Sequence, residues 1–283
     1  MSESLREESF SVTTERGDTV YGDLRWFEDG SVKPAVIFCH GFKGFKDWGP
    51  FPAWGRALAN AGFVSIHFNF SHNGVTPEHP TEFEALDAFA RNTFTTELAD
   101  AKAVLDYVAE GTRGVAPVDS GRIGLMGHSR GGGTAILLAE RDERVRALAT
   151  WASVSTFTGR FTDAQIQDWE EQGYTEVING RTGQVMRLNR SLYDDAMAHE
   201  EELDIPAAAE RLDLPWLIVH AEDDEAVDIR AADRLKAVHP GATLLKAEGG
   251  HTFGGAHPYN GTVPDSLKHV WDETIGFFDS VLR

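Results

Sequence analysis

The chain has 283 residues, 41% of them hydrophobic, which is enough for one α/β domain with a full core and a modest insertion. Lys and Arg number 26 against 45 Asp and Glu, and the resulting net charge of −19, without any basic stripe, excludes nucleic acid as a partner. No apolar run approaches the roughly 18 residues of a membrane span, and residues 1–8 are too polar for a secretory signal, so we expect a cytoplasmic protein without a membrane partner.

The order of the predicted elements indicates a mostly parallel sheet flanked by helices. Residues 9–28 alternate in polarity around Arg16-Gly17-Asp18 and predict an antiparallel hairpin. Further strands are predicted at residues 35–39, 63–70, 122–127, 145–151, 215–220 and 242–246, and helices at residues 52–61, 94–111, 132–140 and 207–212. Strands that alternate with helices pair in parallel, so we predict the α/β class.

The pentapeptide Gly127-His128-Ser129-Arg130-Gly131 lies between a predicted strand and a predicted helix. This is the setting of a nucleophile elbow, whose sharp turn directs the central side chain away from the backbone. Glycines two residues before and two residues after the centre remove Cβ atoms that would clash in so tight a turn. The pattern therefore predicts Ser129 as a nucleophile.

A nucleophilic serine needs a base, and the base needs an acid that orients it. After an elbow of this kind, the acid comes next along the chain and the histidine follows. The candidate acids in the loop after the strand at 215–220 are Glu222, Asp223 and Asp224. The candidate base after the last predicted strand is His251, and His257, six residues later, is its competitor. Both loops follow the C-terminal end of a strand, where open α/β sheets place their ligands.

Four motifs make the chain resemble the α/β-hydrolase-fold serine hydrolases, and more narrowly their dienelactone hydrolase-like and cinnamoyl (feruloyl) esterase-like branch. They are His40-Gly41-Phe42, residues 127–131, Asp223-Asp224 with Val227, and Gly250-His251. The resemblance runs from about Val36 to the C-terminus and implies a mostly parallel eight-stranded sheet. In such families the acid loop often reads Gly-x-x-Asp-x-x-Val. Ala221 departs from this pattern at the glycine, but Val227 matches the valine, which selects Asp224 as the acid.

The same resemblance implies an oxyanion hole made of two backbone N–H groups. One belongs to Arg130, directly after the nucleophile at the start of the next helix, and the other to Phe42 in the loop after the strand at 35–39. His40 is interpreted as structural, bonding the loop backbone. The substrate-binding residues that we predict are Gly41, Phe45, Trp48 and His128. Phe45 and Trp48 either line the acyl pocket or pack the loop, and packing or a local hydrogen bond is the alternative for His128.

Residues 157–206 interrupt the alternation of strands and helices. They contain a predicted helix at 163–172 and a predicted hairpin at 176–186. We interpret this stretch as a cap over the active site, inserted into a core formed by residues 1–156 and 207–283, because a loop this long usually has a function. In the esterase-like relatives an insertion here sets specificity. A structural or dimer-forming segment is the alternative.

Neither a metal nor a cofactor is predicted. His67, His72 and His79 lack metal-ligand spacing, and the single cysteine, Cys39, is interpreted as a small buried hydrophobe. In the loop after the strand at 63–70, either Ser71 or His72 contacts substrate or, as we favour, the loop is structural and caps the next segment.

Together these residues predict a serine esterase. In the expected mechanism His251 takes the proton of Ser129, Asp224 orients the imidazole, and an acyl-enzyme forms and is hydrolysed. The expected partner is a small-molecule ester, with an aromatic or medium-sized acyl group by analogy. A small serine peptidase or an acyl transferase on the same triad is the alternative, a non-catalytic binding module is a weaker one, and a homodimer stays open.

Overall fold

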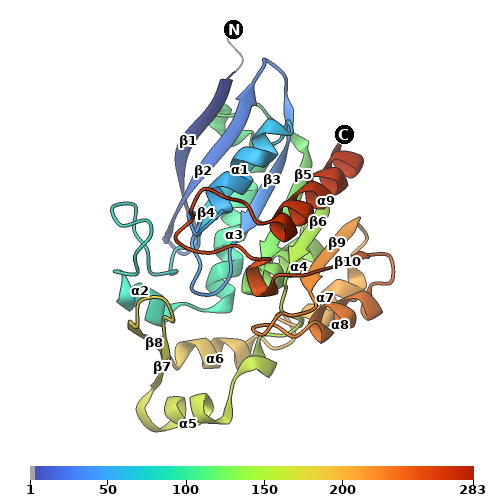
Figure 1. The fold of residues 1–283 in the computed structure, drawn as a ribbon. Helices are drawn as coiled ribbons and strands as arrows, with labels where there is room; N and C mark the ends of the chain where they lie inside the picture. The colour runs from blue at the N-terminus through green and yellow to red at the C-terminus, as the bar shows by residue number, and fades with distance from the viewer. Residues whose placement is uncertain (1–3) are drawn as a thin grey trace.

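Eight strands form one twisted sheet in the computed structural model, which describes residues 4–283 (Figure 1). In chain order the strands are β1 (Ser4–Thr13), β2 (Thr19–Glu28), β3 (Lys33–Cys39), β4 (Val64–Asn69), β5 (Val118–His128), β6 (Val145–Trp151), β9 (Trp216–Ala221) and β10 (Thr243–Ala247). Their order in the sheet is β1-β2-β4-β3-β5-β6-β9-β10. The pairs β1/β2 and β2/β4 are antiparallel and all later pairs are parallel, which confirms the predicted hairpin and the mostly parallel sheet.

Helices cover both faces of this sheet. They are α1 (Phe51–Asn60), α2 (Leu86–Arg91), α3 (Phe94–Ala109), α4 (Arg130–Arg141), α7 (Ile205–Arg211), α8 (Arg230–Val238) and α9 (Asp265–Leu282), with short 3₁₀ turns η1 (Thr112–Gly114) and η3 (Gly250–Thr252). No helix within residues 4–283 has both the length and the apolar character needed to cross a membrane.

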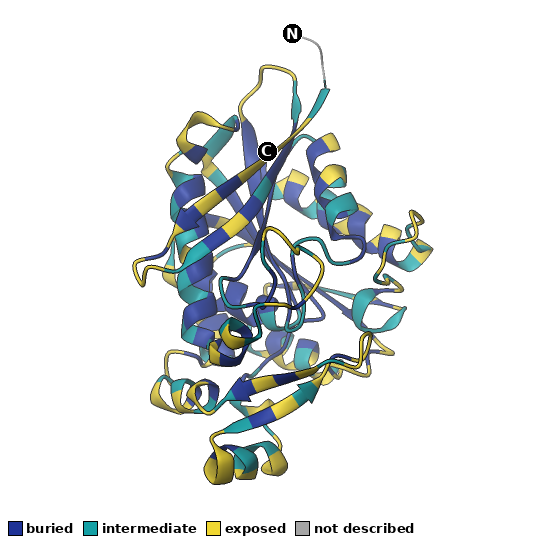
Figure 2. Ribbon diagram, turned by 90° about the vertical axis from the view of Figure 1, so that its left-hand side faces the viewer, coloured by how far each residue is buried: buried dark blue, intermediate teal, exposed yellow. Residues whose placement is uncertain are grey.

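The central strands are buried on both sides because a hydrophobic core lies on each face of the sheet. Along β3, Ile37 and Cys39 pack into the core that includes α3 and α4, whereas Val36 and Phe38 pack into the core that includes α1 and α9. Alternate side chains of a strand point to opposite faces, so a strand covered on both faces is apolar throughout. Figure 2 shows these strands as dark blue between helices with exposed outer faces.

After β6 the chain leaves the sheet, and we call residues 157–206, which end in the first turn of α7, the inserted segment. Its elements are η2 (Thr158–Arg160), α5 (Asp163–Gln172), β7 (Tyr174–Ile178), β8 (Val185–Asn189) and α6 (Ser191–Ala198). The strands β7 and β8 form their own antiparallel pair. In Figure 1 the inserted segment lies below the large sheet, in yellow-green to gold.

Aromatic side chains of the inserted segment pack on one another and continue the core that includes α3 and α4. Trp169 is almost fully buried, donates its indole N–H to the carbonyl oxygen of Leu188 at 2.8 Å, and stacks on Tyr193 at 5.6 Å between ring centroids. Its two ends meet at one point of α4, because Phe157 and Ile205 both lie against Gly133, where a Cβ would be within 3 Å of each side chain. The segment therefore leaves the core and re-enters it at one place.

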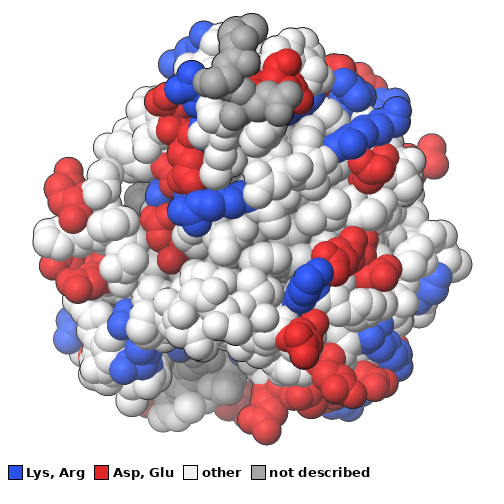
Figure 3. Space-filling view, turned by 45° about the horizontal axis from the view of Figure 1, so that its top comes forward, with Lys and Arg blue, Asp and Glu red and all other residues white. Residues whose placement is uncertain are grey.

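Charged side chains lie mainly on the surface, in keeping with the strongly acidic composition. Figure 3 shows one face of the molecule, where carboxylate groups gather along the lower edge and the left side with Lys and Arg side chains among them. Such faces keep a protein soluble and repel other anions at long range.

Candidate active site

Ser129 occupies a strained turn between β5 and α4. Its φ of 56° and ψ of −121° lie in a region that L-residues rarely adopt. The surroundings hold this conformation: the Ser129 N–H donates to the carbonyl oxygen of Trp151 at 2.9 Å, and the Val154 N–H donates to the Ser129 carbonyl at 3.2 Å. Gly131 completes the turn, because a Cβ there would lie 2.3 Å from the carbonyl oxygen of His40. The structure thus gives residues 127–131 the geometry of the predicted elbow.

His251 and Asp224 meet at the C-terminal edge of the same sheet. His251 lies in η3 after β10, Asp224 lies in the loop after β9, and the imidazole Nδ1 is 2.8 Å from Asp224 Oδ2. A carboxylate only accepts hydrogen bonds, so Nδ1 carries the hydrogen and Nε2 is left as a proton acceptor. This is the tautomer that a general base toward a serine hydroxyl requires.

Asp224 is held as a carboxylate by a full set of donors. Its Oδ1 accepts the N–H groups of Ala226 and Val227 at 2.8 and 2.9 Å, and His220 lies 3.4 Å from Oδ2. Burial by itself would raise the pKa of Asp224, but the hydrogen bonds from His220, His251 and Val227 outweigh it and hold the pKa well below its usual range. Asp224 is therefore charged throughout the neutral range.

The competing acids and the competing histidine lie elsewhere. Asp223 accepts the N–H groups of Gly249 and Gly250 at 3.3 and 3.0 Å and so ties the two loops together. Glu222 is exposed and pairs with Lys246 at 3.7 Å. His257 accepts the Gly49 N–H at 2.9 Å and stacks on Trp48. Of these candidates, only Asp224 and His251 are hydrogen-bonded to each other.

His128 holds the backbone of His251 through a hydrogen bond. It is buried, and its Nε2 donates to the backbone carbonyl of His251 at 2.9 Å, with the two rings 4.8 Å apart. Burial first, and then the neighbouring His251, lower the pKa of His128 to about 3, so it is neutral. The sequence suggested a substrate contact for His128, but the structure gives it a long-range bond that positions the His251 loop.

The loop after β3 passes directly beside the elbow. A Cβ on Gly41 would lie 2.9 Å from the Cβ of Ser129, so glycine allows this close approach. His40 donates from Nδ1 to the Gly41 carbonyl at 2.9 Å, and its Nε2 accepts the Phe70 N–H at 3.3 Å. Burial lowers the pKa of His40 to about 4 and keeps it neutral for both bonds. His40 is thus a structural residue that shapes this loop.

The backbone N–H groups of Phe42 and Arg130, which are predicted to form an oxyanion hole, are free to donate hydrogen bonds to an oxyanion. Within residues 4–283, neither the Phe42 N–H nor the Arg130 N–H donates to a protein acceptor. Arg130 is the first residue of α4, where backbone N–H groups have no partner inside the helix and the helix dipole favours negative charge.

A cavity of about 350 Å³ lies between Ser129 and His251 on one side and the inserted segment on the other. Its lining from the core comprises Phe42, Lys43, Phe94, Ser129, Arg130, Val154, Ala226, Val227 and His251. Its lining from the inserted segment comprises Phe157, Arg160, Phe161, Gln165, Trp169, Val177, Leu188 and Leu192. The sequence did not single out the lining residues of the inserted segment. Their only signal was the concentration of aromatic residues near its start.

Arg130 contributes a second feature to this cavity through its side chain. The guanidinium lies 4.0 Å from the centre of the Phe42 ring and pairs with the buried Glu97 at 3.4 Å. Asn92 donates to the same Glu97 oxygen at 2.7 Å. The positive charge of Arg130 is thus matched by a carboxylate outside the cavity lining.

Three of the other predicted substrate-binding residues lie outside this lining. Phe45 is buried against Phe83 and His257, and Trp48 packs on Phe51. These rings pack the loop, which is the second of the two roles that the sequence allowed. Gly41 touches Ser129 but only through its backbone.

Ser71 holds its loop through a buried carboxylate. Its N–H and its hydroxyl both donate to Asp100 Oδ2, at 2.7 and 2.9 Å. Burial raises the pKa of Asp100 to about 7 in spite of these bonds. Because the unfolded chain loses this proton near pH 4, the folded state binds more protons between about pH 4 and 7, and stability falls as the pH rises through that interval.

Replacing Asp100 with Asn is therefore expected to stabilise the protein at pH 8. An amide has no charge to desolvate and keeps the acceptor for Ser71, so we expect Tm at pH 8 to rise by roughly 5 °C. The gain should shrink toward pH 5, which circular dichroism melts at both values would measure. Asp213→Asn, at an exposed site, is the control. An unchanged or lower Tm at pH 8 for Asp100→Asn would refute this account.

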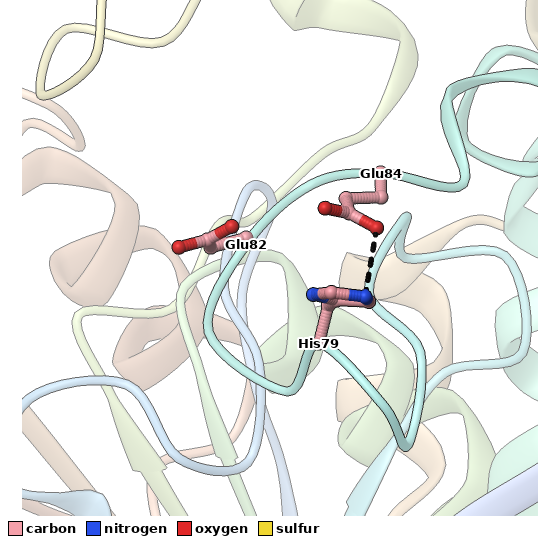
Figure 4. A group of neighbouring side chains, drawn as sticks. All are labelled: His79, Glu82 and Glu84. Atoms are coloured by element: carbon pink, nitrogen blue, oxygen red, sulfur yellow. Dashed lines mark ion pairs between the residues drawn. The ribbon is translucent and has the colours of Figure 1, made fainter.

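In the part of the chain that the structure describes, one group of side chains has ligand atoms close enough to hold a metal ion. His79, Glu82 and Glu84 lie on one exposed loop, with His79 Nε2 3.3 Å from Glu84 Oε2 (Figure 4). Exposed acidic groups often lie this close for other reasons, and nothing else at this loop points to a ligand, so we assign it no role.

Known proteins resemble this chain in sequence and in fold. The family model described as "alpha/beta hydrolase fold" matches residues 34–188, more than half of the chain. A protein of Escherichia coli, the uncharacterized 31.7 kDa protein in the traX-finO intergenic region, is 28% identical over 123 residues. That match covers 43% of this chain and 38% of the relative, so the chain spans well under half of the relative's length.

Two solved structures illustrate the range of enzymes with this fold. Est1E from Butyrivibrio proteoclasticus, solved with ferulic acid bound, superposes with a TM-score of 0.70 at 19% identity, and the match covers 96% of this chain and 98% of Est1E. A puromycin-hydrolyzing peptidase of Mycobacterium tuberculosis superposes with a TM-score of 0.67 at 17% identity, and the match covers 98% of this chain and 39% of the peptidase. At these identities the likeness shows the fold. With the family match over residues 34–188, it establishes that the chain belongs to the alpha/beta hydrolase fold family.

Proposed function

We propose that the protein is a serine hydrolase that cleaves carboxylic esters. The observation that carries this proposal is that Ser129, in its strained elbow, and His251, paired with Asp224 at 2.8 Å, line the same cavity. A serine and a histidine with an orienting carboxylate are the groups that acyl transfer needs. No metal or cofactor is required for this chemistry.

In the proposed mechanism, Ser129 Oγ attacks the ester carbonyl while His251 Nε2 takes its proton. Negative charge develops on the carbonyl oxygen, where the free N–H groups of Phe42 and Arg130 stabilise it. The C–O bond of the ester breaks, the alcohol leaves with the proton from His251, and Ser129 is acylated. Water then attacks the acyl-enzyme by the same steps and releases the acid.

We also propose that the inserted segment is the cap that selects the substrate. Its side chains supply about half of the cavity lining, including the rings of Phe157, Phe161 and Trp169. Rings suit an aromatic or medium-sized acyl group, and closure over the site would exclude water. Peptidase activity is the second candidate, because the mycobacterial peptidase shares the fold over nearly the whole of this chain.

The test compares substrates under one assay. The panel holds p-nitrophenyl esters from C2 to C12, methyl ferulate and an aminoacyl-p-nitroanilide. We expect ester cleavage, an optimum at medium chain length, and no cleavage of the anilide. A fluorophosphonate should add one adduct, which peptide mass spectrometry should locate on Ser129. Cleavage of the anilide in preference to all esters would favour the peptidase, and a folded protein without any adduct or turnover would refute the proposal.

A further inference from the structure

The charged residues that line the cavity are basic, whereas most charged residues of the protein are acidic. The chain has 45 acidic and 26 basic residues, yet the cavity lining holds Lys43, Arg130 and Arg160 and no carboxylate. Glu97, which lies outside the lining, forms an ion pair with the Arg130 guanidinium. Within residues 4–283, neither Lys43 nor Arg160 takes part in an ion pair, so both charges are available to a ligand.

These two cations are fixed in place but keep free donors. Lys43 Nζ donates one hydrogen bond to the Ile178 carbonyl at 3.1 Å, and Arg160 Nη2 donates one to the Ala226 carbonyl at 2.9 Å. An ammonium has three N–H donors and a guanidinium has five, so most of them have no protein acceptor. Each bond joins the inserted segment to the core, which holds the charges at the cavity.

The backbone at Lys43 adopts a conformation that most residues avoid. Its φ of 56° lies in the left-handed region, where glycine is favoured and another residue costs roughly 1 kcal/mol or more. Glycine occurs in the same loop at positions 41 and 44, yet position 43 holds a lysine. A lysine at the strained position supplies a cation beside the Phe42 ring, 5.7 Å from its centre.

We propose that the substrate is an ester that carries an acidic group, a carboxylate, in addition to its apolar or aromatic part, and that Lys43 and Arg160 bind this group. This inference rests on the proposed ester hydrolysis and narrows its substrate class. The rings of the cavity bind the apolar part, and the two cations select for the charge. An exposed acidic surface repels an anion, so local cations are needed to bind one.

The test uses ester pairs that differ only in a carboxylate and a methyl group. One pair places the group on the acid side: the p-nitrophenyl esters of 3-(4-carboxyphenyl)propanoate and 3-(4-methylphenyl)propanoate. The other places it on the alcohol side: 4-carboxybenzyl and 4-methylbenzyl butanoate. We expect the wild type to prefer the carboxylate in at least one pair, by about tenfold in kcat/KM, which is the effect of a charge-assisted hydrogen bond.

The variants Lys43→Gln and Arg160→Gln separate charge recognition from a merely structural role. Each should lower kcat/KM for the preferred carboxylate ester by about tenfold more than for its methyl partner. Intrinsic reactivity cancels because each ester is compared with itself. Arg187→Gln is the matched control, since this arginine lies on β8 of the same segment but outside the cavity lining, and it should leave both esters unchanged.

Two results would overturn the inference without touching the proposed function. One is Ser129-dependent hydrolysis with no carboxylate preference in either pair. The other is equal loss for both partners in the variants, which would mean that the two cations only hold the inserted segment to the core. If no ester is cleaved, the proposed function fails, and calorimetric titration with 3-(4-carboxyphenyl)propanamide against its methyl analogue still decides the inference: tighter binding of the carboxylate supports it, and equal binding refutes it.

Discussion

Ser129→Ala is expected to lower kcat for ester hydrolysis by about 10⁶-fold and leave the fold intact. The hydroxyl is the only group that this change removes, and in the proposed mechanism it forms the covalent bond to the substrate. Residual turnover of about 10³–10⁴ over the uncatalysed reaction should persist, because the oxyanion donors and the cavity are still present. Alanine also keeps the strained turn, since it has the same Cβ as serine.

The measurement is kcat on the best p-nitrophenyl ester, with the far-ultraviolet spectrum and Tm as checks of folding. Ser280→Ala is the matched control, because this serine lies on the exposed side of α9 and bonds only to its own helix. Wild-type turnover in a folded Ser129→Ala protein would show that the elbow is not the reactive centre.

Asp224→Asn is expected to lower kcat by about 10⁴-fold without unfolding the protein. The N–H groups of Ala226 and Val227 will hold the amide oxygen at the position of Oδ1. The amide NH₂ then faces His251 Nδ1, which must become an acceptor. The hydrogen moves to Nε2, the nitrogen that should take the proton of Ser129, so the base is in the wrong tautomer.

The control for this prediction is Asp228→Asn, an exposed aspartate in the same loop region that pairs with Arg230. It should change kcat by less than about twofold, because exposed ion pairs contribute little. If Asp224→Asn had an effect as small as its control, the carboxylate would have no part in orienting His251.

The fold could be predicted from the sequence where apolar periodicity and length agree. The predicted strand at residues 145–151 and helix at residues 163–172 have the observed bounds of β6 and α5. A strand buried on both faces and a helix that begins with the Thr162–Gln165 capping box have strong local signals. In contrast, the sequence did not predict α2 and α6, which are only six and eight residues long. The α6 helix buries only Leu192 and Ala196, which are too few to produce a periodic pattern.

The site was predictable only where a local motif carries it. The elbow around Ser129 and the acid loop with Val227 are contiguous, so their residue types and spacing were visible in the sequence. The hydrogen bond from His128 to His251 joins residues 123 positions apart, and no pattern in the sequence around either residue predicts it. The same holds for Lys43 and Arg160, whose proposed role depends on the inserted segment lying against two loops of the core.

The meeting of both ends of the inserted segment at Gly133 has a consequence for how this enzyme scaffold can diversify. A unit that departs from and returns to one point can be lengthened, shortened or exchanged without moving the strands that carry Ser129, Asp224 and His251. One continuous stretch of about 50 codons encodes about half of the cavity lining. A single recombination event in that stretch would therefore change the set of substrates that fit the cavity while Ser129, Asp224 and His251 stay in place.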